Sequence, residues 1–264
     1  MKNHLIISLL FLSVGFSQQE YDGNDIIEMD NGLWSVKFSD EPITGKVYGY
    51  FGEEGNLEKV YIGNLLNGKK EGKWTWWYHE TGRKSEEINY KKGEIDGLHI
   101  EWYENGNKES EGTVKDGKWD GLLTKWYEDG QKFFEISFKV GIEDGLSTEW
   151  YVNGQKRFQR TKKNGKDDGL YIEWYKNGNK KIERTIKDGK RDGLDTWWYE
   201  NGQKRYEGTL KNGKDDGLFT NWYENGQKKY ESVSDDGNQI SEECWDEDGN
   251  ECECTQEEWS SGCK

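Results

Sequence analysis

The chain has 264 residues and a formal net charge of −15, with 52 acidic residues against 37 Lys and Arg. Only 31% of its residues are hydrophobic, well below the roughly 45–50% of an ordinary globular domain, which excludes a deep aliphatic core. The 14 Trp, 15 Tyr and 34 Gly, with a single Pro, argue against a disordered acidic chain. The composition therefore favours a thin structure that buries aromatic rings, and the acidic balance predicts no nucleic-acid partner.

Residues 1–17 have the features of a secretory signal peptide. Lys2 gives a positive start, residues 5–14 form an apolar run interrupted only by Ser8 and Ser13, and small residues lie close to a plausible cut after Ser17. This run is shorter than the about 20 residues that cross a bilayer. We therefore expect an exported protein, periplasmic or secreted, with no membrane insertion after signal removal.

Residues 18–60 resemble the later repeats only weakly. Two short stretches, 30–34 and 44–46, carry the same glycine-centred pattern, but the spacing between them is irregular. Repeat arrays need atypical units at their ends, because an ordinary unit would leave its packing surface open. We predict that residues 18–60 form an N-terminal cap made of degenerate repeats.

Residues 61–233 contain a repeat with a period of 24 residues. Trp-Tyr pairs are spaced 25 residues apart once and 24 thereafter, beginning at Trp77, Trp102, Trp126, Trp150, Trp174, Trp198 and Trp222. A glycine lies five residues before each of these tryptophans. Each unit has two predicted glycine turns, one after Trp-Tyr and one reaching from Asn-Gly or Asp-Gly to the glycine before the tryptophan.

The segments between these turns have the composition of β-strands. They are about six to eight residues long and rich in Trp, Tyr and Thr, so each unit is predicted to be a β-hairpin. Seven hairpins predict an all-β fold, an elongated antiparallel β-meander that forms an open solenoid of about fourteen strands. At roughly 4.8 Å per strand the array would be about 65–70 Å long.

The two faces of the predicted sheet differ in how much they vary. On one face, the first, third and fifth positions after the glycine carry Leu, a β-branched residue and Trp in nearly every unit, and we predict that this face is packed. The other face varies from unit to unit, and we expect it to carry recognition, with a freely varying solvated face as the alternative. The candidate binding residues on the variable face are Trp74, Trp76, His99, Tyr171, Trp197 and Phe219.

Charged residues recur on the second strand of each hairpin. A lysine occupies one position in all seven units, from Lys84 to Lys228, and three residues later comes Glu, except at Gln159. We expect these rows to cover apolar surface and to discourage edge-to-edge association. A ladder that binds anions is the alternative.

The repeating unit resembles a known family. Gly-Leu-x-x-x-Trp-Tyr-Glu-Asn-Gly-Gln-Lys followed by Asn-Gly-Lys-x-Asp-Gly is similar to the MORN-repeat variant of bacterial proteins labelled YwqK-type toxin–antitoxin system antitoxin components. The resemblance covers about residues 46–250. It implies an elongated antiparallel β-array with a binding role, antitoxin-like in the terms of that family.

Residues 234–264 are predicted to form an acidic C-terminal cap that contains all the cysteines. Cys244, Cys252, Cys254 and Cys263 lie within 20 residues, and export favours disulfides. A bond between Cys252 and Cys254 is geometrically unfavourable, so Cys244 is expected to pair with one of these two and Cys263 with the other. A zinc site of four thiolates is the rival, although Cys-x-x-Cys pairs are absent.

No residues form a recognisable catalytic or cofactor motif. His79 lies in an irregular turn and His99 on the variable face, neither within a known nucleophile or metal motif. The acidic group that begins at Asp246 fits a hairpin turn better than a calcium loop. We therefore predict that the protein is not an enzyme and holds no cofactor and no metal.

These observations predict a scaffold for protein–protein interaction in the cell envelope or the extracellular space. The expected partner is a protein that the sequence does not identify. The alternative is a carbohydrate-binding array, in which exposed aromatic side chains stack on sugar rings, and a glycan is then the partner.

Overall fold

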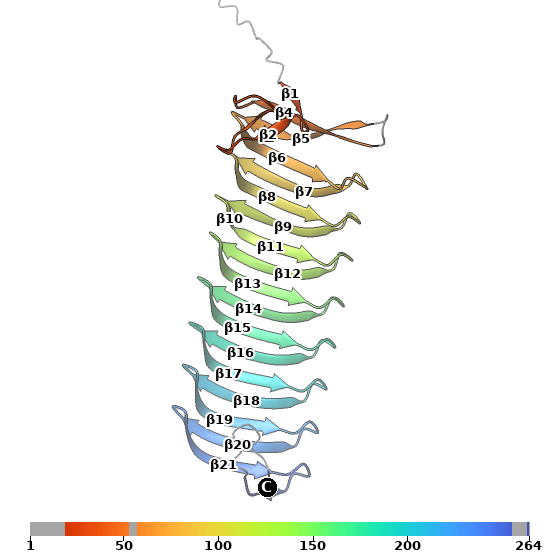
Figure 1. Ribbon diagram of the computed structural model, residues 1–264. Coiled ribbons are helices and arrows are strands. Elements are labelled where there is room, and N and C mark those ends of the chain that lie inside the picture. Colours follow the sequence, from red (N-terminus) through yellow and green to blue (C-terminus); the bar gives the residue numbers. More distant parts are fainter. Residues whose placement is uncertain (1–18, 53–56, 255–262, 264) are drawn as a thin grey trace, which may run out of the picture.

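The computed structural model describes residues 19–52, 57–254 and 263 (Figure 1). The signal peptide predicted at residues 1–17 lies outside the described residues. All regular elements in the described segments are β-strands. The described part of the chain accordingly has no helix with the length and apolar character that crossing a membrane would require.

The strands fall into an N-terminal group and a regular array. The N-terminal strands are β1 (Glu20–Asp22), β2 (Ile26–Glu28), β3 (Trp34–Val36), β4 (Gly45–Phe51) and β5 (Glu58–Leu66). The first strands of successive hairpins are β6 (Lys69–Trp77), β8 (Glu94–Trp102), β10 (Lys118–Trp119) with β11 (Gly121–Trp126), β13 (Ile142–Trp150), β15 (Lys166–Trp174), β17 (Lys190–Trp198), β19 (Lys214–Trp222) and β21 (Asn238–Trp245). The return strands are β7 (Lys84–Lys91), β9 (Lys108–Lys115), β12 (Lys132–Lys139), β14 (Lys156–Lys163), β16 (Lys180–Lys187), β18 (Lys204–Lys211), β20 (Lys228–Asp235) and β22 (Glu251–Cys252).

The array is an open antiparallel meander, as the sequence predicts. Consecutive strands from β4 onward pair with one another within a 20-stranded sheet, and Figure 1 shows the hairpins as parallel tiers stacked along one axis. The exception to antiparallel pairing is β1, which runs parallel to β4. Because the strands of the regular array pair only with their neighbours along the chain, the molecule is extended rather than globular.

The hairpins are joined by two-residue turns in which both residues have positive φ. The turn between β9 and β10, for example, has φ of 49° at Asp116 and 72° at Gly117. This is the type I′ geometry that Asn-Gly and Asp-Gly favour. The turn glycine also donates its N–H to a carbonyl of the preceding unit, as Gly117 does to Ile95 at 3.2 Å, so these turns tie neighbouring units together.

The glycine before each tryptophan lies inside a strand and not in a turn, which differs from our prediction. Gly97 is in the middle of β8, with φ of 122°, and the register of β7 and β8 shifts next to it. The strand therefore bends at this glycine, and Figure 1 shows the same curvature near one end of every tier. The sequence predicts shorter strands of six to eight residues, because the Asp-Gly pair at this bend has the composition of a turn.

The tyrosine of each Trp-Tyr pair recurs because its hydroxyl links neighbouring units. In each of the seven units the tyrosine hydroxyl donates a hydrogen bond to the carbonyl of the next unit's tryptophan, for instance Tyr103 to Trp126 at 2.8 Å. The other six pairs are Tyr78–Trp102, Tyr127–Trp150, Tyr151–Trp174, Tyr175–Trp198, Tyr199–Trp222 and Tyr223–Trp245. The tyrosine is thus a connector between units.

The lysine row also connects units. Each of the seven lysines lies over the tryptophan ring of the following unit, 5.4–5.8 Å from the ring centroid, as Lys84 does over Trp102. Six of these lysines contact the glutamate three residues later, as Lys84 does at 3.0 Å from Glu87, and Lys156 contacts Gln159 at 3.3 Å. Because these lysines and glutamates already hold each other and the rings, the arrangement favours the structural interpretation over an anion-binding ladder.

The prediction of which face is packed is wrong at the leucine and at the variable positions. The outer leucines are about half exposed, with fractions of 47–53% from Leu122 to Leu218. The variable face instead contains some of the most buried side chains, such as Trp74 at 3% and Asp195 at 1% exposed. The strand bend is the reason, because it folds the sheet toward the variable side. We call this side the inner face and the leucine side the outer face.

The ends of the array have their own packing. At the N-terminal end, Trp74 joins a buried cluster with Ile26, Ile43, Val47 and Leu65, which links the irregular strands to the first hairpin. The C-terminal end carries two disulfides, Cys244–Cys254 and Cys252–Cys263. This is one of the two pairings that the sequence left open, and it removes the thiolates that a zinc site would need.

Candidate functional site

The inner face is the part of the array whose chemistry changes along the axis. Its central row, the floor, consists of the second position after each strand glycine together with the return-strand residues paired with it. The first-strand floor residues are Trp74, His99, Leu123, Ser147, Tyr171, Asp195 and Phe219. The adjacent row, the wall, is half-buried and carries Trp76, Glu101, Lys125, Glu149, Glu173, Trp197 and Asn221.

At the N-terminal end, aromatic rings surround a lysine. The ammonium of Lys70 is 4.9 Å from the ring centroid of Trp74, 5.2 Å from Trp76 and 5.0 Å from Tyr90. Trp34 adds a fourth ring at 5.4 Å. Burial lowers the pKa of Lys70. Two predicted binding residues, Trp74 and Trp76, thus already pack around a cation of the chain itself.

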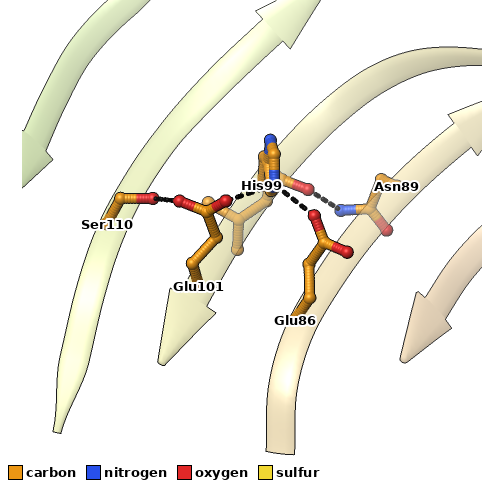
Figure 2. A network of polar contacts seen from close by, with 6 residues as sticks. Glu86, Asn89, His99, Glu101 and Ser110 are labelled. Atoms are coloured by element: carbon orange, nitrogen blue, oxygen red, sulfur yellow. Dashed lines mark hydrogen bonds and ion pairs between the residues drawn. The ribbon is translucent and has the colours of Figure 1, made fainter. Parts of the chain in front are cut away.

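His99 lies in a separate polar cluster (Figure 2). Its Nε2 is 2.9 Å from a carboxylate oxygen of Glu86 and 4.0 Å from one of Glu101. The imidazole stacks on Trp119, with ring centroids 5.7 Å apart and planes within 9°. The bend of the strand makes this contact possible, since it brings the start of the next hairpin over the floor.

The middle of the inner face carries ion pairs. Glu143 contacts both Lys162, at 3.0 Å, and Arg160, at 3.3 Å. Arg160 is the strand partner of Tyr171, which in turn is the partner of Arg184. A tyrosine between two arginines thus forms the centre of the floor.

Tyr171 and Trp197 meet through Arg184. The guanidinium of Arg184 lies 5.6 Å from the ring centroid of Tyr171 and 5.5 Å from that of Trp197. The Tyr171 hydroxyl donates to Glu173, and burial, followed by this hydrogen bond, raises the pKa of Tyr171 to about 12. The Trp197 indole N–H donates to Asp195 at 2.7 Å.

Phe219 belongs to a third aromatic group. It is 4% exposed and lies against Tyr206, whose ring centroid is 6.2 Å away. Tyr206 also contacts Trp197 edge to face at 6.0 Å, and burial raises the pKa of its phenol. Of the six predicted residues, the structure therefore gathers Tyr171, Trp197 and Phe219 into one stretch, Trp74 and Trp76 into another, and leaves His99 with its own partners.

Sequence reasoning missed the residues that hold these groups in place. Lys70, Arg184 and Tyr206 each contact a floor or wall residue, but they lie on strands whose variation looked like that of a solvated surface. Strand register could have identified Arg184, because Arg184 is the cross-strand partner of the candidate residue Tyr171. The first disulfide cysteine, Cys244, lies on β21, which is separated by β20 from the strand of Phe219, and the other cysteines follow it in the chain.

Comparison with known families supports the repeat architecture. Five segments match the family described as MORN repeat variant, at residues 95–116, 119–139, 167–188, 191–212 and 215–236. Each segment runs from one type I′ turn to the next, and the unmatched unit between them, β13 and β14, has the same pairing. No curated protein matches the chain. MORN repeats commonly act as scaffolds that bind proteins or membranes and are generally non-catalytic.

Proposed function

We propose that the chain is a non-catalytic scaffold that binds a protein partner along its inner face. The observation that carries this proposal is the contrast between the two faces. On the outer face, the recurrent lysine and glutamate contact each other, and the lysine also contacts the tryptophan of the next unit. The inner floor and wall vary along the array although the backbone does not, so the repeat itself does not require their identities.

The half-buried wall supports a protein rather than a sugar as the partner. Trp76 and Trp197 are partly accessible, and charged residues such as Glu149 lie between them along the same row. Aromatic anchors with intervening charges are typical of protein interfaces. Sugar stacking needs an open ring face, whereas Trp74 and Phe219 are 3% and 4% exposed.

Photo-crosslinking on the two faces of one strand tests the proposal. Leu194, 52% exposed, lies on the outer face of β17 and Trp197 on its inner face. A photoreactive amino acid is placed at either position, and the chain is incubated with a cell-envelope extract. We expect a protease-sensitive adduct of defined mass from position 197 and none from position 194.

Two further measurements complete this test. An excess of the Trp197→Ala chain, without the photoreactive residue, should fail to reduce the adduct from position 197. An excess of the Leu194→Ala chain should reduce it as the unmodified chain does. Adducts from position 194 alone would contradict inner-face binding. Glycan-array binding that Trp197→Ala abolishes, without any protein adduct, would establish the carbohydrate-binding alternative instead.

We also propose that the chain functions after export. Its antitoxin-like role is proposed from the family resemblance alone. The two disulfides support an oxidising compartment. The resemblance to YwqK-type proteins makes a toxin one candidate partner. Mass spectrometry of the protein from its native compartment should find a mature N-terminus near Gln18, and a full-length chain in the cytoplasm would overturn the proposed export.

A further inference from the structure

Three metal-binding side chains converge at one point of the inner face (Figure 2). Glu86 comes from β7, and His99 and Glu101 come from the inner side of β8. One donor atom from each lies within 4.8 Å of the other two. The pairing of the strands brings them together, since Glu86 is the register partner of Glu101. An imidazole nitrogen and two carboxylates thus face a common position.

Within the segments that the structure describes, the two glutamates have no lysine or arginine as an ion-pair partner. Like charges on directly opposed residues of paired strands destabilise a sheet. Among the described residues, the only ion-pair contacts of Glu86 and Glu101 within 4.0 Å are to His99. In the described part of the chain, neither glutamate therefore has a lysine or arginine within 4.0 Å to balance its charge.

In later units, a glutamate at the same wall position has a basic side chain as its partner. Where a glutamate occupies it, a basic residue eight positions later contacts that glutamate. These pairs are Glu149 with Arg157 and Glu173 with Lys181. Eight positions after Glu101 the chain carries Glu109, an acid. The cation that the repeat supplies elsewhere is therefore replaced by a third negative charge in this unit alone.

Neighbouring side chains orient the donors. The Ser110 hydroxyl donates to the second oxygen of Glu101 at 2.5 Å, and Trp119 holds the His99 ring by stacking. Such outer contacts fix ligands in metal sites. The His99 side chain is 15% exposed and the glutamates 33% and 36%, so the cluster is partly desolvated but open to an entering ion.

We propose that Glu86, His99 and Glu101 bind one divalent transition-metal ion, with Zn²⁺ as the best-suited species. Zinc bonds to histidine nitrogen and carboxylate oxygen are about 2.1 Å long, which places tetrahedral ligands about 3.4 Å apart. The separations of 2.9 and 4.0 Å bracket that value. An imidazole donor favours zinc-like ions over Ca²⁺ and Mg²⁺, which prefer oxygen.

The proposal goes beyond a scaffold function, and it differs from the expectation that the chain holds no metal. Sequence spacing does not reveal the set, because Glu86 and His99 are brought together by strand register and not by a short motif. Three protein ligands leave a coordination position for water or for a group of a bound partner.

Titration of the full chain with ZnCl₂ tests the site. The chain, with its disulfides oxidised, is stripped with a chelator, dialysed and titrated in a calorimeter. We expect saturation at one ion per chain and a rise in Tm on saturation. His99→Gln and Glu101→Gln should each weaken binding at least tenfold and remove the Tm shift.

His79→Gln is the matched control, because it removes the other histidine of the described residues and should bind Zn²⁺ like the unmodified chain. Circular dichroism of each variant establishes that it is folded, and the near-isosteric Glu86→Gln provides a second route if one variant is not. Three results would overturn the proposal: no saturable binding, binding by His99→Gln equal to that of the unmodified chain, or Ca²⁺ binding as tightly as Zn²⁺.

Discussion

Val140 is a β-branched residue in a backbone conformation that suits asparagine. It occupies the first position of a type I′ turn with φ of 52°, where other units carry Asn, Asp or Lys. A left-handed conformation costs an ordinary residue roughly 1–2 kcal/mol, and Asn and Asp relieve part of this cost by local hydrogen bonding. The side chain is 59% exposed, so it contributes little burial in return.

Val140→Asn should therefore stabilise the protein by about 1 kcal/mol. The backbone N–H of residue 140 keeps its hydrogen bond to Asp120, because the substitution changes only the side chain. Urea unfolding measures the change, and Asn212→Val, at the matching turn, should destabilise by a similar amount. A less stable Val140→Asn variant would show that this turn is not strained.

Tyr171 gives the protein a stability contribution that disappears at high pH. Its pKa is about 12 in the folded state, raised first by burial, against about 10 for an unfolded tyrosine. The folded state holds this proton more tightly, so the contribution is complete below pH 10 and is lost as pH rises through 12.

Tyr171→Phe should accordingly lose less stability than the unmodified chain between pH 10 and pH 12. Unfolding by urea at several pH values gives the slopes to compare. The phenolate absorbance difference between the two proteins locates the titration directly, and ionisation of Tyr171 close to pH 10 would contradict the prediction.

At the scale of single residues, the sequence predicts which residues have a structural role better than it predicts which side chains are buried. The recurrence of Tyr103 and its equivalents indicates a structural role, and the hydrogen bond to the next unit supplies it. The burial of Asp195 is not predictable in the same way, because it depends on the bend at the strand glycine and on Trp197, whose indole N–H the aspartate accepts. Local patterns do not report such cross-strand partners.

Within the hairpins, glycines on return strands make room for large floor residues. Gly208 is the register partner of both Asp195 and Phe219. A Cβ atom on Gly208 would lie 2.2 Å from the Phe219 ring and 2.6 Å from the Tyr206 hydroxyl. Neighbouring strands are thus matched in size across the inner face, and the variation of one row is compensated in the next.

Gly208→Ala should destabilise the protein by about 1–3 kcal/mol, because the added methyl group collides with a well-packed ring. Phe219→Ala alone should cost about 3–5 kcal/mol through the cavity that it leaves. In the double variant the two effects should be less than additive by about 1 kcal/mol or more, since the methyl group enters that cavity.

Thermal or urea unfolding of the four proteins in this cycle gives the coupling. Thr209→Ala, one residue along the same strand and exposed on the outer face, is the control and should change stability little. Strict additivity of Gly208→Ala and Phe219→Ala would show that the close approach is relieved elsewhere.

The hairpin elements were predictable from the sequence because their turn chemistry and period are local. Which glycine makes the turn was not, since Asp-Gly in β8 and Asp-Gly at residue 116 have the same sequence signature. The pairing of inner-face residues follows from the register, which depends on the bulges next to each tryptophan. The His99 cluster could therefore be located only after the strands were aligned.

Across the whole molecule, stability is built from contacts between neighbours. The hydrogen bonds from Tyr78 through Tyr223 each link one unit to the next, and no strand of the regular array pairs with a distant one among the described residues. Such arrays behave as one-dimensional chains of repeats, in which a unit responds less to a local change the farther it lies from that change.

The net charge is also uneven along this axis. Residues 230–264 carry twelve acids and one base, whereas residues 1–229 carry 40 acids and 36 bases. The array is close to neutral and its C-terminal end is strongly acidic. Long-range attraction of a basic partner would therefore act at that end, while short-range contacts along the inner face select among partners.

Reduction of the two disulfides should loosen the C-terminal end without unfolding the array. Cys244–Cys254 and Cys252–Cys263 close loops of 10 and 11 residues, which stabilises the linked segment by about 3 kcal/mol each in the chain-entropy estimate. The effect should stay local, because the strands from β10 to β19 lie between β9 and the strands next to the cap. Hydrogen exchange measured with and without reductant should show lost protection in β20 and β21 and unchanged protection in β8 and β9. A variant with all four cysteines replaced by serine should match the reduced chain and ignore the reductant, whereas a uniform loss of protection would mean that the array unfolds as a single cooperative unit.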